Sequence, residues 1–271
     1  MLKYSVLMSL YINEKPEHLR QSIESMINQT IKPDEIVIVK DGPITKELED
    51  VLEEFSTNYS DLFKIVPSEK NIGLGLALNL GLENCRNELV ARMDTDDISL
   101  PDRCEKQLEA FKKDEELVLL GTMINEFFDD PKNIISSRIV PTKHKEIYEF
   151  SKRRSAFNHP TVMFKKSKVL ECGGYSNMRR NQDVDLFGRM LFSGFKAANL
   201  NEALLLYRVD NNLLKRRKSW ENTKSYIATI RKFWKMGYSS LGDFILVCLG
   251  QIIMFLCPLS IQNWIYKNIL R

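Results

Sequence analysis

Short apolar segments alternate with helical segments four times in the first 113 residues, and this alternation constrains the fold more than any other feature. The apolar segments are Ser5–Leu10, "EIVIVK" (35–40), "LFKIVP" (62–67) and "ELVARM" (88–93). Apolar runs without strict alternation are typical of strands buried on both faces. Helices are predicted at 16–29, 45–55, 73–84 and 101–113. This order predicts an α/β fold with a Rossmann-like, mostly parallel sheet flanked by helices.

After Leu120 the regular alternation of predicted strands and helices ends. Two further strands are predicted in "HPTVMFKK" (159–166) and "ALLLYRV" (203–209), with antiparallel pairing open for both. Between them, "DVDLFGRMLFSG" predicts a helix that Gly194 ends, because glycine readily adopts the left-handed conformation that follows a helix. A long basic helix is predicted from Asn212 to Lys235.

The charge of the chain is unevenly distributed. The net charge is only +3, which indicates no nucleic-acid partner, but residues 211–271 carry +8 and the remainder −5. Within this basic segment, Phe244–Cys257 is almost wholly apolar. Its 14 residues are too few to span a bilayer, which takes about 20. The segment is therefore either a helix packed on the domain or a helix lying in a membrane interface.

The cysteines argue against a disulfide or zinc framework. There are five, an odd number, and none of them forms a C-x-x-C pair. Such a set is typical of reduced thiols in a cytosolic protein.

Three aspartates follow the fourth predicted strand within four residues. Asp94, Asp96 and Asp97 stand in "MDTDDISLPDR", where a buried strand opens into a loop. Ligands of open α/β sheets bind beyond the carboxyl ends of the strands, and carboxylate oxygens suit Mg²⁺ or Mn²⁺. In the alternative interpretation, Asp97 or Ser99 only caps a helix that Pro101 begins. Both interpretations can hold together.

Other polar residues have a structural and a functional interpretation. Asp183 and Asp185 begin a predicted helix, where acids favour the helix dipole, yet a carboxylate there is also a candidate general base. His159 in "NHPTVMF" is either a loop histidine or an acceptor contact. Arg208 and Arg216 belong to a charge run that is either a solvated face or a contact for a diphosphate or phospholipid.

Six segments in a fixed order carry a resemblance to a known family. They are "SLYINEKPEHLRQSIESMINQT", "PDEIVIVKDGP", "NIGLGLALNLGL", "ARMDTDDISLPDR", "NHPTVMF" and "NQDVDLFGRM". Together they resemble the family 2 glycosyltransferases of GT-A fold, and among these the bacterial capsule and exopolysaccharide enzymes of the amylovoran type. The resemblance covers residues 1 to about 210 and continues more loosely to the end.

The resemblance implies roles for particular residues. Asp41 would contact the uracil of a UDP-sugar, with the Ser9–Tyr11 loop lining the same pocket. Asp94 would hold the ribose, Asp96 would bind Mn²⁺ or Mg²⁺, and Asp183 would be the catalytic base. Asn71 and Arg103 complete the expected donor site.

Two departures from the family pattern concern the same site. Gln182 stands where relatives carry a Glu next to the catalytic Asp, so any support from that carboxylate is absent. Asp210 stands where many relatives carry a His after "YRV", which puts a third metal-side ligand in doubt.

The resemblance also implies an organisation and a place of action. Residues 1–120 would bind the nucleotide sugar, 121–210 the acceptor, and 211–271 would form a helical extension that associates with membrane. The expected reaction is an inverting transfer to a saccharide acceptor. The basic, apolar C-terminal segment suggests an acceptor linked to polyprenyl diphosphate at the cytoplasmic face of the inner membrane. The alternatives are a metal-dependent nucleotidyltransferase and a non-catalytic, membrane-associated partner in a polysaccharide assembly complex.

Overall fold

The parallel strands predicted from the first 113 residues form one half of a nine-stranded mixed sheet. The structure is a computed structural model that describes residues 2–210, 218–258 and 261–262. Its first elements are β1 (Tyr4–Leu10), α1 (Pro16–Ile27), β2 (Glu35–Lys40), α2 (Lys46–Asn58), β3 (Phe63–Pro67), α3 (Leu74–Asn84) and β4 (Leu89–Arg92). The strands β3, β2, β1 and β4 lie side by side in this order and are all parallel.

The second half of the sheet adds antiparallel pairs. Its elements are β5 (Ile98–Ser99), α4 (Arg103–Lys113), β6 (Leu117–Phe127), β7 (Ile134–Arg138), α5 (His144–Ser151), the 3₁₀ turn η1 (His159–Thr161), β8 (Met163–Lys165), α6 (Lys166–Glu171), α7 (Gln182–Phe192) and β9 (Lys196–Arg208). β8 is antiparallel to both β4 and β6, whereas β9 runs parallel to β6. The sheet is therefore mixed from β8 onward.

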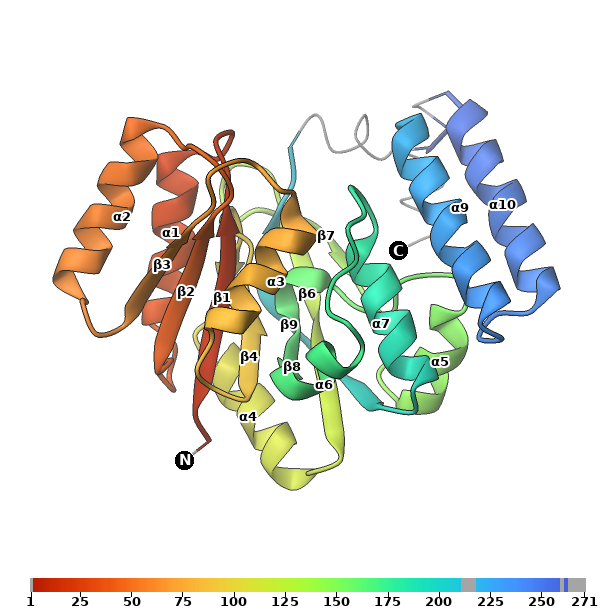
Figure 1. The fold of residues 1–271 in the computed structure, drawn as a ribbon, viewed down its shortest axis with the longest axis horizontal. Helices are drawn as coiled ribbons and strands as arrows, with labels where there is room; N and C mark the ends of the chain where they lie inside the picture. The colour runs from red at the N-terminus through yellow and green to blue at the C-terminus, as the bar shows by residue number, and fades with distance from the viewer. Residues whose placement is uncertain (1, 211–217, 259–260, 263–271) are drawn as a thin grey trace.

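Alternate residues of the central strand belong to two separate hydrophobic cores. Tyr4, Val6 and Met8 of β1 pack with α1, α2 and α4 on one face of the sheet. Leu7 belongs to the core on the other face, where α3, α7 and the first C-terminal helix lie (Figure 1). Because both faces are covered, the strand is apolar without alternation, as predicted.

Two predictions for residues 97–127 were wrong. The helix predicted from Pro101 begins only at Arg103, and Ser99 lies in β5, which pairs with β9. No side chain caps α4, so neither Asp97 nor Ser99 acts as its cap. The sequence analysis also missed β6, an 11-residue strand in the middle of the sheet.

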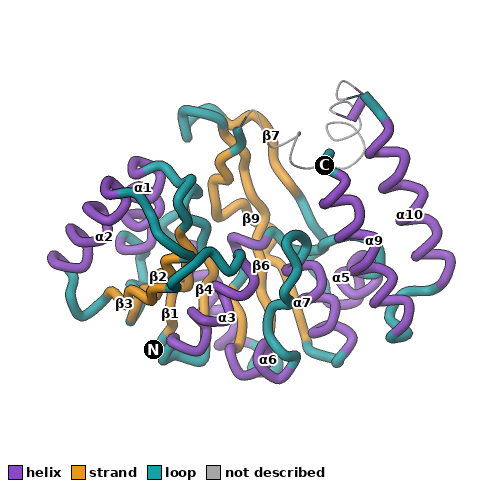
Figure 2. The backbone as a smooth tube through the Cα atoms, turned by 45° about the horizontal axis from the view of Figure 1, so that its top comes forward, coloured by secondary structure: helices purple, strands orange, loops and turns teal. Residues whose placement is uncertain are grey.

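The C-terminal segment folds into a helical hairpin. Its helices are α9 (Trp220–Lys235) and α10 (Leu241–Leu256), which stand side by side in both views (Figures 1 and 2). α9 is shorter than the predicted 212–235 helix: Ser219 caps it, and residues 211–217 lie outside the described part of the chain. α10 confirms the predicted apolar helix, and its first turn carries a capping box between Ser240 and Asp243.

One close contact holds the hairpin against α7. Phe233 of α9 is fully buried against Gly188 of α7, where a Cβ atom would lie 2.0 Å from the ring. Lys232 on the same helix pairs with the fully buried Asp185 of α7 at 2.5 Å. The absence of a side chain at Gly188 is thus what allows α9 to approach α7.

We expect Gly188→Ala to lower the free energy of unfolding by about 1–3 kcal/mol, because the buried ring has no room to move. The matched control is Gly250→Ala in α10, where nothing lies within 4 Å of the added methyl group. That change should raise the free energy of unfolding by about 0.5–1 kcal/mol through helix propensity alone. Urea denaturation measures both, and equal effects would show that the Gly188 contact does not seat the hairpin.

Candidate functional site

Three carboxylates converge in the loop that follows β4, which we call the acidic loop (residues 94–97). One oxygen each from Asp94, Asp96 and Asp97 lies within 4.8 Å of the others, and no other such group occurs in the described part of the chain. Asp97 is fully buried: its Oδ1 accepts the Arg208 amide at 2.8 Å, and its Oδ2 has no protein partner. Asp94 forms an ion pair with the buried Arg92.

Side chains from two distant elements brace the acidic loop. Thr95 donates to the carboxylate of Glu14 at 2.9 Å. Arg208, at the end of β9, donates through Nε to the Asp96 carbonyl at 2.9 Å, and its guanidinium lies over the Phe127 ring. Arg208 therefore lies beside the acidic loop, next to the expected donor site.

The crowding of acids changes their ionisation. Burial raises the pKa of Asp96 to about 7, and the negative charges of Asp94 and Glu14 add to the shift. Burial also raises the pKa of Asp97, again with help from its acidic neighbours. Like charges this close repel one another unless a proton or a cation is present. The hard oxygen donors and the unpartnered Asp97 oxygen fit a divalent cation such as Mn²⁺ or Mg²⁺.

The expected nucleotide-binding residues gather at the neighbouring strand ends. Ser9 lies near the end of β1 and Tyr11 follows that strand, whereas Asp41 directly follows β2. The two carboxylate oxygens of Asp41 accept the amides of Ile72 and Gly73, at 2.6 and 3.1 Å. Asn71 donates to the Asp41 carbonyl at 3.3 Å. Asp41 and Asn71 thus hold together the loop that leads into α3.

Arg103 lies apart from these residues. It is fully buried, and its guanidinium donates to the carbonyls of Arg92 and Pro160, at 3.3 and 2.8 Å. In the structure Arg103 supports the backbone beneath the acidic loop, and it does not line the cavity described next.

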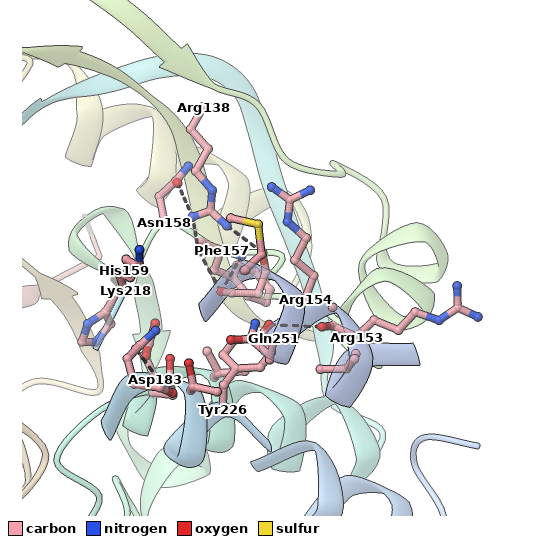
Figure 3. Close-up of a pocket in the computed structure, with 18 of the residues that line it drawn as sticks. Arg138, Arg153, Arg154, Phe157, Asn158, His159, Asp183, Lys218, Tyr226 and Gln251 are labelled. Atoms are coloured by element: carbon pink, nitrogen blue, oxygen red, sulfur yellow. Dashed lines mark hydrogen bonds between the residues drawn. The ribbon is translucent and has the colours of Figure 1, made fainter. Parts of the chain in front are cut away.

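A cavity of about 700 Å³ connects the acidic loop to the C-terminal hairpin. Asp94 and Arg92 line one end, Asp183 lies on α7, and Tyr226 and Gln251 come from α9 and α10 (Figure 3). The remaining lining residues include basic, aromatic and apolar side chains, among them Arg138, Arg153, Arg154, Phe157, Asn158, His159, Lys218, Val247 and Met254. The carboxylates of two separate motifs thus line one cavity.

Asp183 and His159 both line this cavity, and burial shifts their pKa values in opposite directions. Asp183 is half-buried in the first turn of α7, and burial raises its pKa, while backbone amides and the charge of Arg138 act the other way. His159 is bonded to the Tyr175 hydroxyl at 3.0 Å, and burial holds its pKa well below the usual range. His159 is therefore neutral at pH 7, and the raised pKa makes Asp183 a stronger base than an exposed aspartate.

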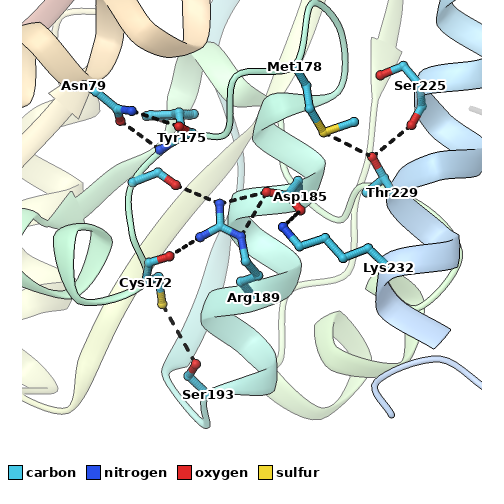
Figure 4. A network of polar contacts seen from close by, with 11 residues as sticks. Asn79, Cys172, Tyr175, Met178, Asp185, Arg189, Ser193, Ser225, Thr229 and Lys232 are labelled. Atoms are coloured by element: carbon cyan, nitrogen blue, oxygen red, sulfur yellow. Dashed lines mark hydrogen bonds and ion pairs between the residues drawn. The ribbon is translucent and has the colours of Figure 1, made fainter. Parts of the chain in front are cut away.

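Asp185 faces away from the cavity. Its carboxylate is fully buried between Arg189 of α7, at 2.8 Å, and Lys232 of α9 (Figure 4). Arg189 also donates to the carbonyls of Cys172 and Gly174. Asp185 holds the hairpin to α7 and does not line the cavity, and Arg216 lies outside the described residues.

The sequence analysis missed several residues that line the cavity or contact the acidic loop. A charged residue inside the fully buried strand β4 was the signal that could have identified Arg92. Glu14, Arg138 and Tyr226 carry no such signal, because only the folded chain brings them to the site.

Comparison with known proteins identifies the family. A model described as Glycosyl transferase family 2 matches residues 5–180. The chain belongs to glycosyl transferase family 2. The amylovoran biosynthesis glycosyltransferase AmsE of Erwinia amylovora is 37% identical over 98% of each chain. An Escherichia coli protein named UDP-Gal:alpha-D-GlcNAc-diphosphoundecaprenol beta-1,3-galactosyltransferase is 36% identical over 99% of this chain and 97% of its own length.

Solved structures of glycosyltransferases share the fold of this family 2 enzyme. S. aureus TarS 1-349 in complex with UDP-GlcNAc superposes with a TM-score of 0.68 and 15% identity, covering 99% of this chain and 76% of the TarS 1-349 chain. The mannosyltransferase PcManGT of Pyrobaculum calidifontis, in complex with GDP-Man and Mn²⁺, has a TM-score of 0.67 and 14% identity, covering 94% of this chain and 70% of its own. These findings confirm the predicted family and GT-A fold, whereas the roles of single residues stay predictions.

Proposed function

We propose that this chain is an inverting glycosyltransferase that moves a sugar from a UDP-sugar to a lipid-linked saccharide in cell-surface polysaccharide synthesis. The observation that carries the proposal is the single cavity that contains both Asp94 of the acidic loop and Asp183 of α7. A leaving group held at one and a base at the other would place the anomeric carbon between them. The UDP-sugar named for the Escherichia coli relative and the UDP-GlcNAc complex of TarS support the choice of donor.

The nucleotide would bind over the carboxyl ends of β1 and β2. Ser9 and Tyr11 border this region, and Asp41 carries carboxylate oxygens that each retain a lone pair beyond the loop amides they accept. A uracil N–H group is a suitable donor to such an oxygen. Asn71 stands at the same edge.

Asp96, with Asp94 and Asp97 beside it, would hold Mn²⁺ or Mg²⁺. A bound divalent cation offsets negative charge on a departing diphosphate. Asp94 lines the cavity and is held in place by Arg92, so it would also reach the ribose.

Asp183 would accept the proton of the attacking acceptor hydroxyl. It lies across the cavity from the acidic loop, as an inverting reaction requires of its base. The neutral His159 beside it would bind the acceptor without competing for the proton.

The far end of the cavity suits an acceptor with negative charge and an apolar tail. Among the described lining residues, five are cationic (Arg92, Arg138, Arg153, Arg154 and Lys218) and three are acidic (Asp94, Glu126 and Asp183). Arg138, Arg153 and Arg154 line the cavity (Figure 3), as do Val247, Met254 and Phe255 of α10. Arginine binds phosphate oxygens well, so a polyprenyl diphosphate fits this end.

The outer side of α10 would lie on an anionic membrane. Leu241, Ile245, Leu249, Ile252 and Leu256 form one apolar stripe along it, each at least 41% exposed. The neighbouring α9 exposes Lys224, Arg231 and Lys235 together with Trp220, which suits a negatively charged lipid surface. None of the described helices has both the length and the apolar character needed to cross a bilayer. We therefore propose peripheral binding at the cytoplasmic face of the inner membrane.

We expect Asp183→Asn to remove most turnover and leave UDP affinity unchanged, because the amide cannot accept the proton. In the unmodified enzyme, kcat should fall as the pH drops through the raised pKa of Asp183, since only the ionised carboxylate is a base. UDP release from the donor in the presence of acceptor, measured over pH at saturating metal, reports both effects. Near-normal turnover of Asp183→Asn would exclude Asp183 as the base.

We expect Mn²⁺ to bind about tenfold more tightly at pH 8 than at pH 6 in the presence of UDP. With a pKa of about 7, Asp96 must lose its proton before it can bind the cation, and it is mostly ionised only at the higher pH. Asp96→Asn should weaken binding and abolish this pH dependence, whereas Asp102→Asn, just outside the acidic loop, should do neither. Calorimetric titration gives the affinities, and identical values at both pH values would remove Asp96 from the metal site.

We expect Leu249→Glu to reduce binding to anionic vesicles roughly tenfold, because a charge replaces buried apolar area in the lipid interface. The matched control is Leu170→Glu in α6, a similarly exposed leucine far from the hairpin. Sedimentation with phosphatidylglycerol vesicles measures the bound fraction. A protein that stays in solution with these vesicles, or two variants that bind alike, would contradict the membrane proposal.

A further inference from the structure

Among the described side chains that line the cavity, Arg92 has the most buried hydrogen-bond donors without a partner. Its side chain is 1% exposed, and its Nη2 pairs with Asp94. Its Nε and Nη1 have no hydrogen-bond partner in the described structure. A buried donor without a partner costs about 1–3 kcal/mol, and more when it is charged. Such a group at a cavity wall indicates a ligand that supplies the missing oxygens.

The backbone fixes where these donors point. Arg92 donates its own amide to the Val162 carbonyl, and its carbonyl accepts from the guanidinium of Arg103. β4 is therefore held from both sides, and the Arg92 side chain extends into the cavity from a rigid strand.

The guanidinium lies between the two halves of the proposed active site. It lines the same cavity as Asp94, His159 and Asp183, and its positive charge shifts the pKa values of His159 and Asp183 downward. If the leaving diphosphate is at the acidic loop and the base is Asp183, then the sugar ring occupies the space between them. Sugar hydroxyl groups accept and donate hydrogen bonds, which matches a donor, Arg92, next to an acceptor, Asp94.

We propose that Arg92 binds the hydroxyl oxygens of the transferred sugar and so determines donor-sugar specificity. This inference rests on the proposed function. Arg92 is a binding residue here, and the nucleotide itself lies elsewhere, over β1 and β2. A site built to hydrogen-bond a hydroxyl group strongly rejects the analogue that lacks it, because its own donors are then left unpaired.

The experiment compares UDP with complete donors on full-length protein. A panel of UDP-, GDP- and dTDP-sugars with Mn²⁺ first identifies the donor that the unmodified protein binds. Arg92→Lys keeps a positive charge beside Asp94, and Arg92→Met keeps the length without charge. Arg92→Lys should bind the free nucleotide within about twofold of the unmodified protein and the sugar donor about tenfold or more weakly. Arg92→Met also leaves Asp94 unpaired, so its nucleotide affinity should fall as well, but by a smaller factor than its affinity for the sugar donor. Asp94→Asn provides the contrast: it breaks the same ion pair and leaves the two N–H donors in place, and because Asp94 lies at the proposed ribose and metal site it should weaken nucleotide and donor by a common factor.

Monodeoxy versions of the same donor separate a direct contact from a structural role. In the unmodified protein, removing the hydroxyl that Arg92 binds should weaken affinity about tenfold, whereas in Arg92→Met the same deoxy donor should bind as well as the parent sugar. Urea denaturation confirms that each variant is folded.

Three outcomes would overturn the assignment. If nucleotide and donor weaken by one common factor, Arg92 contacts the diphosphate or supports the fold. If the affinity for neither the nucleotide nor the donor falls, the two free Arg92 donors are hydrogen-bonded to water and not to the sugar. If every deoxy donor loses the same factor in both proteins, the contact is absent. A protein that binds no nucleotide sugar of the panel would instead overturn the proposed function and, with it, this assignment.

Discussion

The buried ion pair between Asp185 and Lys232 sets the relation between the sheet and the C-terminal hairpin. Asp185 is on α7, two residues after Asp183, and the two carboxylates point in different directions. A charge at a fully buried position is tolerated only when it is paired, and here Arg189 and Lys232 both pair with it. The same helix therefore holds the hairpin with one acid and presents the other to the cavity that the hairpin closes.

This arrangement explains why the sheet with the proposed nucleotide site and an apolar helix occur in one chain. The acidic loop is held by contacts within the sheet domain, from Glu14, Arg92 and Arg208, but the cavity is also lined by residues of α9 and α10. α10 contributes to that wall with its inner side and exposes its leucines and isoleucines on the outer side. A hairpin placed this way would bring a membrane-bound acceptor next to Asp183, which is the physical basis of the proposed lipid-linked substrate.

The sequence predicted those parts of the fold that depend on local pattern. The four parallel strands, the helices after them and the acidic cluster at the end of β4 follow from apolar runs and their breaks. The sequence analysis did not predict β6, because its apolar residues (117–127) come after the last repeat of the strand–helix alternation. It placed the start of α4 two residues early, because the pairing of Ser99 with β9 overrides the local preference of proline for a first helical turn.

In the candidate site, the sequence could not predict the direction in which side chains point. Asp183 and Asp185 are two residues apart, and only the packing of α9 decides which of them faces the cavity. Arg208 was expected near an acceptor diphosphate, yet β9 carries it to the acidic loop, 112 residues away in sequence. Arg103 was expected at the donor and is instead a buried support of β4. Long-range contacts of this kind have no signature in a local pattern.

The most direct test of the account is a crystal structure of the protein with Mn²⁺ and the nucleotide sugar that it binds. The account predicts the cation at Asp96, the nucleotide over the ends of β1 and β2, and the anomeric carbon facing the carboxylate of Asp183 across the cavity. A sugar bound outside this cavity, or an anomeric carbon that faces away from Asp183, would contradict the central claim that one cavity joins the leaving group to the base.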